Sequence, residues 1–140
     1  MITTAADFER LKEMFHAEIT GLTDTQLDWD DTAEEWSQWS IRRQVSHVAL
    51  AYLFWLSKSW GKILWPDNPP ANQVDFSKAG VYDRRLDEEK FWRLGDLLPK
   101  FDEALALATR VAGEKNEEEM RALVLERTFE PEMMMGKTDL

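Results

Sequence analysis

The stretch that decides the fold is SIRRQVSHVALAYLFWLSKSW, residues 40–60. Ser40 is a favoured helix N-cap, and Gly61 directly after the stretch is a typical helix stop. Apolar residues recur at helical spacing and form a main stripe, which consists of Ile41, Val45, Val48, Tyr52, Trp55 and Leu56. A second apolar strip lies roughly opposite and contains Leu50, Ala51 and Phe54, with His47 continuing it toward the N-terminus. Because a helix that is apolar on nearly every side is normally buried on every side, we expect this helix to be the central element of the fold.

A helix is also predicted before this stretch. It begins after Thr4, whose hydroxyl can cap it while Asp7 completes a capping box, and it ends near Gly21. Its apolar stripe consists of Phe8, Leu11, Phe15, Ile19 and Leu22. The stripe predicts that one face of this helix packs on a helical core.

A third helix is predicted from Asp87 to Gly113. Its apolar residues follow the alternating spacing of three and four that is typical of a helix in a bundle, and they are Phe91, Leu94, Leu98, Phe101, Leu105, Ala108 and Ala112. Pro99 lies inside this pattern and would crowd the carbonyl of Gly95. We therefore expect a bend of more than about 20° in the helix at this point.

The remaining segments are predicted as connections and a tail. Residues 23–38 form a polar connection with three anchors, Leu27, Trp29 and Trp36. Prolines and Gly80 interrupt any period between residues 65 and 86, which indicates a long crossover loop. A weaker helix over residues 117–127 has Asn116 as its cap and Glu119 at the third position, and its acidic run Glu117 to Glu119 is predicted to be a solvated helix start. An apolar tail, Met133 to Gly136, follows Pro131.

Length and composition fit one all-α domain over residues 1–140. Leu, Ala and Met outnumber Val and Ile, which favours helices because unbranched side chains lose less rotamer freedom there. The chain has no cysteine, so disulfides, thiolate metal sites and a cysteine nucleophile are excluded. Its net charge of −10 argues against nucleic acid and anionic membranes as partners. The sequence shows neither a signal peptide nor a membrane-spanning run, so we expect a cytoplasmic protein.

Only two histidines are available for catalysis or metal binding. His16 lies at the margin of the first helix's stripe, where we expect it to be partly solvated. His47 shares its strip with apolar residues, and a buried imidazole must have its nitrogens satisfied by hydrogen bonds or by a metal. Trp39 and Trp55 could line an apolar ligand pocket, or pack in the core or at a dimer contact. The pairs Arg42–Arg43 and Arg84–Arg85 are too few to form a nucleic-acid patch on so acidic a chain.

The segment WSIRRQVSH, residues 39–47, resembles the DinB-like family of helical-bundle proteins. In that family a Trp-Ser helix start leads to a histidine, and it is preceded by a Leu-rich segment ending in tryptophan, which here corresponds to residues 22–29. The resemblance extends roughly from Phe8 to Ala112 and also includes the order of elements, two helices, a long crossover and a third helix.

This resemblance implies a four-helix bundle with a three-histidine site for a divalent metal such as zinc or nickel. Its characterised members include metal-dependent thiol S-transferases and isomerases, and by this resemblance the chain is a partial or degenerate metal-dependent enzyme of hydrolase or thiol-transferase type, acting on an unknown small molecule. His47 matches the first metal ligand. The other two ligands normally form a His-x-x-x-His pair on the fourth helix, but no histidine follows His47, and the fourth helix is expected to be short or absent. Whether the chain is an enzyme stays open.

The alternative hypothesis is a non-catalytic helical module for self-association or partner binding. The helix over residues 40–60 is apolar around most of its circumference, yet only two other long helices are predicted to cover it. We expect a strip that contains Leu50 and Phe54 to stay uncovered within one chain. A two-fold homodimer would bury that strip, because self-complementary pairing closes the assembly.

Overall fold

The structure, a computed structural model, describes residues 4–34, 38–71 and 84–123 of the chain. The regular elements in these ranges are helices, and no β-strand occurs in them, which confirms the all-α fold class. In chain order they are α1 (Ala5–Ile19), α2 (Asp24–Leu27), α3 (Ile41–Leu53), η2 (Phe54–Ser59), α4 (Gly61–Leu64), α6 (Leu94–Glu114) and α7 (Glu117–Ala122). None of the helices in the described ranges has the length and apolar content that crossing a membrane requires.

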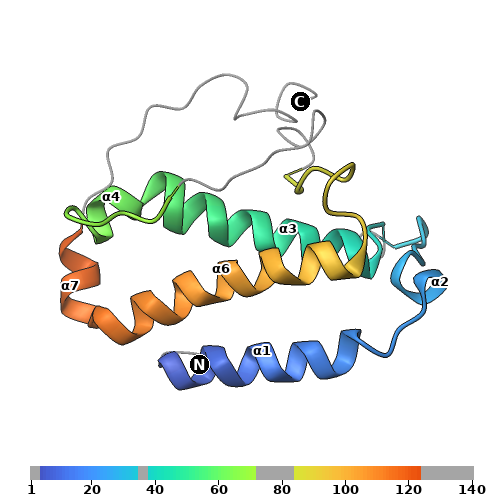
Figure 1. The fold of residues 1–140 in the computed structure, drawn as a ribbon, viewed down its shortest axis with the longest axis horizontal. Coiled ribbons are helices and arrows are strands. Elements are labelled where there is room, and N and C mark those ends of the chain that lie inside the picture. The colour runs from blue at the N-terminus through green and yellow to red at the C-terminus, as the bar shows by residue number, and fades with distance from the viewer. Residues whose placement is uncertain (1–3, 35–37, 72–83, 124–140) are drawn as a thin grey trace.

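The three long helices lie in one layer with α6 in the middle, α3 on one side of it and α1 on the other (Figure 1). Both outer helices pack on α6, whereas they hardly touch each other. The ring of Phe15 on α1 stacks on that of Phe101 on α6, with 4.0 Å between ring centroids. The expectation that the helix over residues 40–60 is central is therefore wrong, because α6 is the helix with packed neighbours on two sides.

The start of α1 agrees with the predicted capping box. The Thr4 hydroxyl accepts a hydrogen bond from the Asp7 N–H, and the Asp7 carboxylate accepts one from the Thr4 N–H. The predicted polar connection contains the short helix α2, capped by Thr23, and it places Leu27 in the core. Trp29 is exposed and is not an anchor, which corrects the prediction. Trp36 lies outside the described residues.

Helix α3 starts after the Ser40 cap, as predicted, but it presents a different face to the core. Its buried residues include Val45, Ala49, Leu50 and Leu53. Ile41, Val48 and Trp55 of the predicted main stripe are exposed instead. The prediction was wrong because it ranked faces by apolar content, whereas α3 turns toward α6 a face that includes the hydrogen-bonded polar residues Arg42 and Ser46. Since Leu50 is buried, the strip that was expected to stay open is not the open one.

The helix over residues 40–60 is also not α-helical to its end. Residues 54–59 form η2, a π-helix, and Gly61 starts α4 rather than ending the helix. A Cβ at Gly61 would lie 3.3 Å from the Leu56 carbonyl oxygen and from the Pro70 ring, so this glycine permits a close chain contact.

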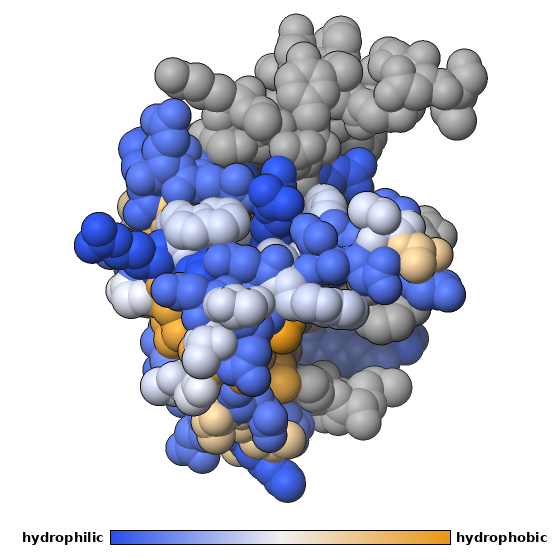
Figure 2. Space-filling model, turned by 90° about the vertical axis from the view of Figure 1, so that its right-hand side faces the viewer, coloured by the Kyte–Doolittle hydropathy of each residue, from blue (hydrophilic) through white to orange (hydrophobic). Residues whose placement is uncertain are grey.

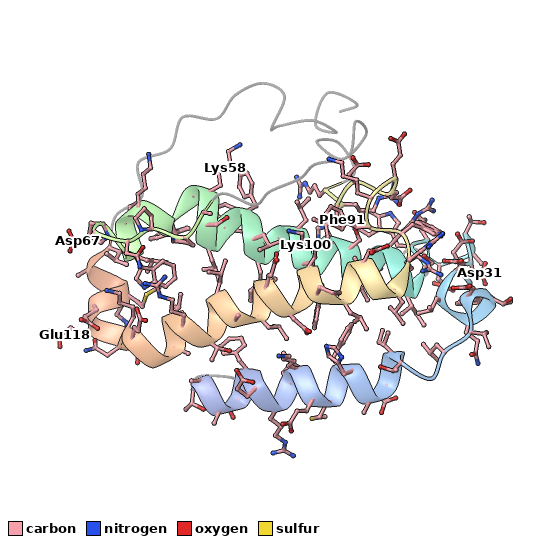
Figure 3. All side chains as sticks on the ribbon, in the orientation of Figure 1. Asp31, Lys58, Asp67, Phe91, Lys100 and Glu118 are labelled. Atoms are coloured by element: carbon pink, nitrogen blue, oxygen red, sulfur yellow. The ribbon has the colours of Figure 1, made fainter. Side chains whose placement is uncertain are left out.

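Helix α6 starts at Leu94 instead of Asp87. Residues 87–90 form a turn, in which the Phe91 N–H donates to the Asp87 carbonyl over 2.9 Å. This segment returns to α6, where the Lys100 ammonium lies 5.5 Å from the centre of the Phe91 ring (Figure 3). α6 continues through Pro99 as one helix, so the bend of the expected size stays a prediction.

The C-terminal helix α7 starts as predicted. Asn116 caps it, and its side chain and that of Glu119 exchange hydrogen bonds with each other's backbone N–H groups. Glu118 lies at the outer surface of α7, so the acidic run is a solvated helix start (Figure 3). Pro131 and the predicted tail lie outside the described residues.

Candidate functional site

His47, the predicted first metal ligand, lies at the margin of the helical layer. Its ring is partly exposed, so His47 is neither enclosed in the core nor fully open to solvent. The Nδ1 atom lies 2.8 Å from the carbonyl oxygen of Arg84, and the ring packs edge-on against Trp39 with 5.2 Å between centroids. Val45 and Ala49 turn toward the core, and this helical phase leaves His47 beside residues 84–86.

The backbone of Arg84 presents its carbonyl to His47 from an unusual conformation. Arg84 has a φ of 54°, in the left-handed region that non-glycine residues seldom adopt. Two residues later the Leu86 N–H donates to the Ser46 hydroxyl over 2.9 Å, and Leu86 is fully buried. These two contacts attach the segment to α3. Neither contact could be predicted from the sequence pattern, because the partners are separated by 37 and 40 positions.

Charged side chains surround this segment. The Arg85 guanidinium lies 5.6 Å from the Trp39 ring centre and pairs with Glu88 over 2.7 Å. Arg43 pairs with the same carboxylate over 3.2 Å. The partly buried Trp39 therefore serves as a contact for His47 and Arg85.

The hydrogen bond to the Arg84 carbonyl determines which ring nitrogen of His47 carries the proton. When Nδ1–H donates to the Arg84 carbonyl, the tautomer is fixed and the lone pair is on Nε2. Within residues 4–34, 38–71 and 84–123, no three His, Cys, Asp or Glu side chains form a group that could hold a metal ion. His47 therefore does not belong to a three-ligand group among the described residues.

Arg42 is the strongest polar centre that sequence reasoning missed. It is 2% exposed, and it donates to Asp28 over 2.5 Å, to Asp24 over 2.8 Å and to the Trp92 carbonyl over 2.6 Å. Its guanidinium also lies 4.8 Å from the centre of the Trp92 ring. Hydrogen bonding to Asp28 raises the pKa of Arg42 above its usual value. Arg42 thus joins α2, α3 and the start of α6, and these contacts are structural.

His16 is partly exposed, as predicted, and it has a partner that the sequence did not show. Its Nε2 atom lies 2.6 Å from an Asp102 carboxylate oxygen. The pair joins α1 to α6 beside the stacked rings of Phe15 and Phe101.

An apolar groove lies between α1 and the start of α3. Its volume is about 530 Å³, and its walls are Leu11, Met14, Phe15, Glu18, Ile19, Leu22 and Ile41. Met14 is 56% exposed and Ile41 is 39% exposed. The end-on view from the α2 side shows orange apolar atoms reaching the surface among blue polar ones in the lower half of the molecule (Figure 2). Trp39 and Trp55, for which the sequence left open a ligand pocket, the core or a dimer contact, are not in its walls.

Beyond Ile41, which lines the groove, α3 and η2 carry two further exposed apolar residues. Val48 lies two helical turns after Ile41 and is 36% exposed, and Trp55 follows after a further seven residues. These residues belong to the stripe that was predicted to be the core face of the helix. Ile41, Val48 and Trp55 are spaced seven residues apart, so α3 and η2 carry an exposed apolar stripe apart from the buried face of α3.

The family relationship that residues 39–47 suggest was compared with known proteins. No family model, no curated protein and no solved structure matches this chain.

Proposed function

We propose that this chain is a helical assembly module whose open side, the groove between α1 and α3, binds a further helix. The observation that carries the proposal is the composition of the groove, in which Glu18 is the single charged wall residue. Solvent-exposed grooves with apolar walls are typical of surfaces that bind an amphipathic helix.

The layer of three helices explains why a helix fits there. α1 and α3 each have α6 as their long packing neighbour, and residues of both helices line the groove. A helix placed between them would contact both and complete a four-helix bundle. The α1 wall is itself a row of residues three and four apart, which is the surface into which another helix's side chains pack.

The groove also gives such binding a driving force. Met14 and Ile41 keep a large part of their surface in water, although each would contribute roughly 1.5–3 kcal/mol if it were fully buried. A helix that covers both recovers part of this energy without disturbing the contacts to α6.

The test uses a labelled, uncharged helical peptide with leucine on one face and glutamine and alanine elsewhere. We expect it to bind the wild-type chain, and binding to weaken at least about tenfold in Met14→Glu and in Ile41→Glu, because each substitution places a charge in the apolar contact. Fluorescence anisotropy measures the affinity. The matched control is Ala106→Glu, on an exposed position of α6 away from the groove. Equal affinity for all four proteins would refute the proposal.

We also propose, as a second candidate, that His47 is a metal ligand of a DinB-like protein. The hydrogen bond from Nδ1 to the Arg84 carbonyl supports it, because metal-binding histidines are commonly oriented in this way. The remaining ligands would have to come from beyond the described residues or from another chain.

The two histidines allow a matched test of this candidate. Calorimetric titration with zinc and with nickel should show binding in the wild-type chain that is lost in His47→Ala and kept in His16→Ala. The reason is that the Nε2 atom of His16 already lies against Asp102. Identical titrations of the three proteins would argue against a metal site at His47.

A further inference from the structure

We infer that the helix that fills the groove is α1 of a second copy of this chain, packed antiparallel to its own counterpart about Met14. The inference rests on the proposed function, because it names the occupant of the same groove. It differs from the dimer expected from the sequence in the surface used, since Leu50 of the expected strip is buried.

The contact surface is a ridge on α1. Arg10, Met14 and Glu18 are four residues apart, so they lie in one row along the helix. Met14 and Glu18 belong to the groove wall, and all three side chains are exposed. Rows of this kind from two helices interdigitate in the most common class of helix packing, with axes crossing at about −50°.

When two copies of this ridge pack antiparallel, each charged side chain lies opposite a side chain of the other sign. With a two-fold axis at Met14, the residue four positions after Met14 faces the residue four positions before it. Glu18 therefore meets Arg10 of the partner subunit, and the symmetry forms this pair twice. Met14 meets its own counterpart at the centre, which buries the most exposed part of the groove wall.

The net negative charge of the chain disfavours most contacts between two copies, and it therefore favours a contact surface whose own charges compensate each other. Two chains that each carry −10 repel each other unless the contact surface compensates. The ridge carries one positive and one negative side chain, so its contact is neutral. A basic helix from another protein would form an ion pair with Glu18, but its positive charges would also repel Arg10.

Ile41 brings a second helix, α3, into the contact. It lies on α3 in the groove wall that faces α1. A helix seated on the α1 ridge therefore also covers Ile41, so that the dimer buries apolar surface from α1 and α3 together.

Analytical ultracentrifugation of the wild-type chain and three charge variants tests the inference. We expect a concentration-dependent dimer, with dissociation constants about tenfold higher in Arg10→Glu and in Glu18→Arg, because each replaces two attractive pairs with two like-charge pairs. The double variant Arg10→Glu/Glu18→Arg should return to the wild-type value. Only a surface that pairs with itself restores affinity in this way. Circular dichroism checks that the exposed substitutions leave the helices intact.

Cross-linking gives a second readout, because the chain has no cysteine of its own. Met14→Cys should form a disulfide-linked dimer under mild oxidation, since the two-fold axis brings the two positions together. Ala106→Cys, on the exposed face of α6, is the control and should form no disulfide-linked dimer.

The outcomes separate this inference from the proposed function. A chain that stays monomeric at all concentrations but binds the leucine–glutamine peptide in its groove would overturn the antiparallel pair and leave the proposed function standing. A dimer that the charge variants do not change would also overturn the pair. A peptide affinity that Met14→Glu and Ile41→Glu leave unchanged would overturn the proposed function itself.

Discussion

At the scale of single residues, Arg42 shows how a full charge is accepted inside a small helical protein. Burying a charge is costly unless it is paired and its donors are satisfied. Arg42 meets this requirement with two carboxylates and one carbonyl, and its flat guanidinium also lies over the Trp92 ring. Because these partners come from α2 and from the residue before Arg93, one side chain fixes three parts of the chain relative to each other.

We predict that Arg42→Ala lowers the free energy of unfolding by about 2–4 kcal/mol, since it leaves a cavity and removes several charge-assisted hydrogen bonds. Arg42→Lys should recover only part of this loss, because an ammonium group cannot reach acceptors in three directions with the geometry of a guanidinium. Asp24→Asn is the control. Asp24 is 89% exposed, so this change should cost less than about 1 kcal/mol. Urea unfolding provides the comparison, and an Arg42→Ala variant as stable as Asp24→Asn would contradict the prediction.

At the scale of elements, a three-residue contact joins α4 to the end of α6. The buried Trp65 donates its indole N–H to Glu114 over 2.6 Å. Arg110 lies over the Trp65 ring, 4.1 Å from its centre, and pairs with Glu114 over 3.1 Å. The hydrogen bond from Trp65, followed by that from Arg110, holds the pKa of Glu114 below its ordinary value of 4.5.

This contact predicts a pH dependence. A carboxylate whose pKa is lowered by folding stabilises the fold above its unfolded pKa, and the contribution is lost as the pH falls through the folded pKa. The stability difference between the wild-type chain and Glu114→Gln should therefore be constant near neutral pH and should shrink as the pH falls below about 4.5. Urea unfolding of both proteins across this range measures it, with Glu118→Gln as the exposed control. A difference that does not change with pH would show that Glu114 is not stabilised by these contacts.

The ends of the elements could be predicted from the sequence better than their faces. The caps at Thr4, Ser40 and Asn116 were predicted because each is a local contact with a residue three positions away. The start of α6 was placed too early, because the turn at residues 87–90 mimics a helix start. The core face of α3 could not be predicted, since its polar residues Arg42 and Ser46 find their partners in distant segments.

In the candidate site, too, local features could be predicted from the sequence and contacts between distant segments could not. The sequence predicts where His47 lies along its helix, but its hydrogen-bond partner is a backbone carbonyl 37 residues away. The groove was not predicted either, because most of its wall residues, including Leu11, Leu22 and Ile41, belong to stripes with the pattern of a core face. An apolar stripe indicates a surface that has to be covered, and it does not say by which helix.

At the scale of the whole molecule, the central position of α6 determines the order in which the long helices can pack during synthesis. Helix α1 is made before α3 and α6, yet its packing partner is the last long helix of the described residues, and the His16–Asp102 contact spans 86 residues. Helix α1 has almost no contact with α3, so α3 alone does not provide α1 with a packing surface (Figure 1). During synthesis α1 therefore stays undocked until α6 has left the ribosome and packed on α3, and its apolar face is exposed to the surrounding solution throughout that interval.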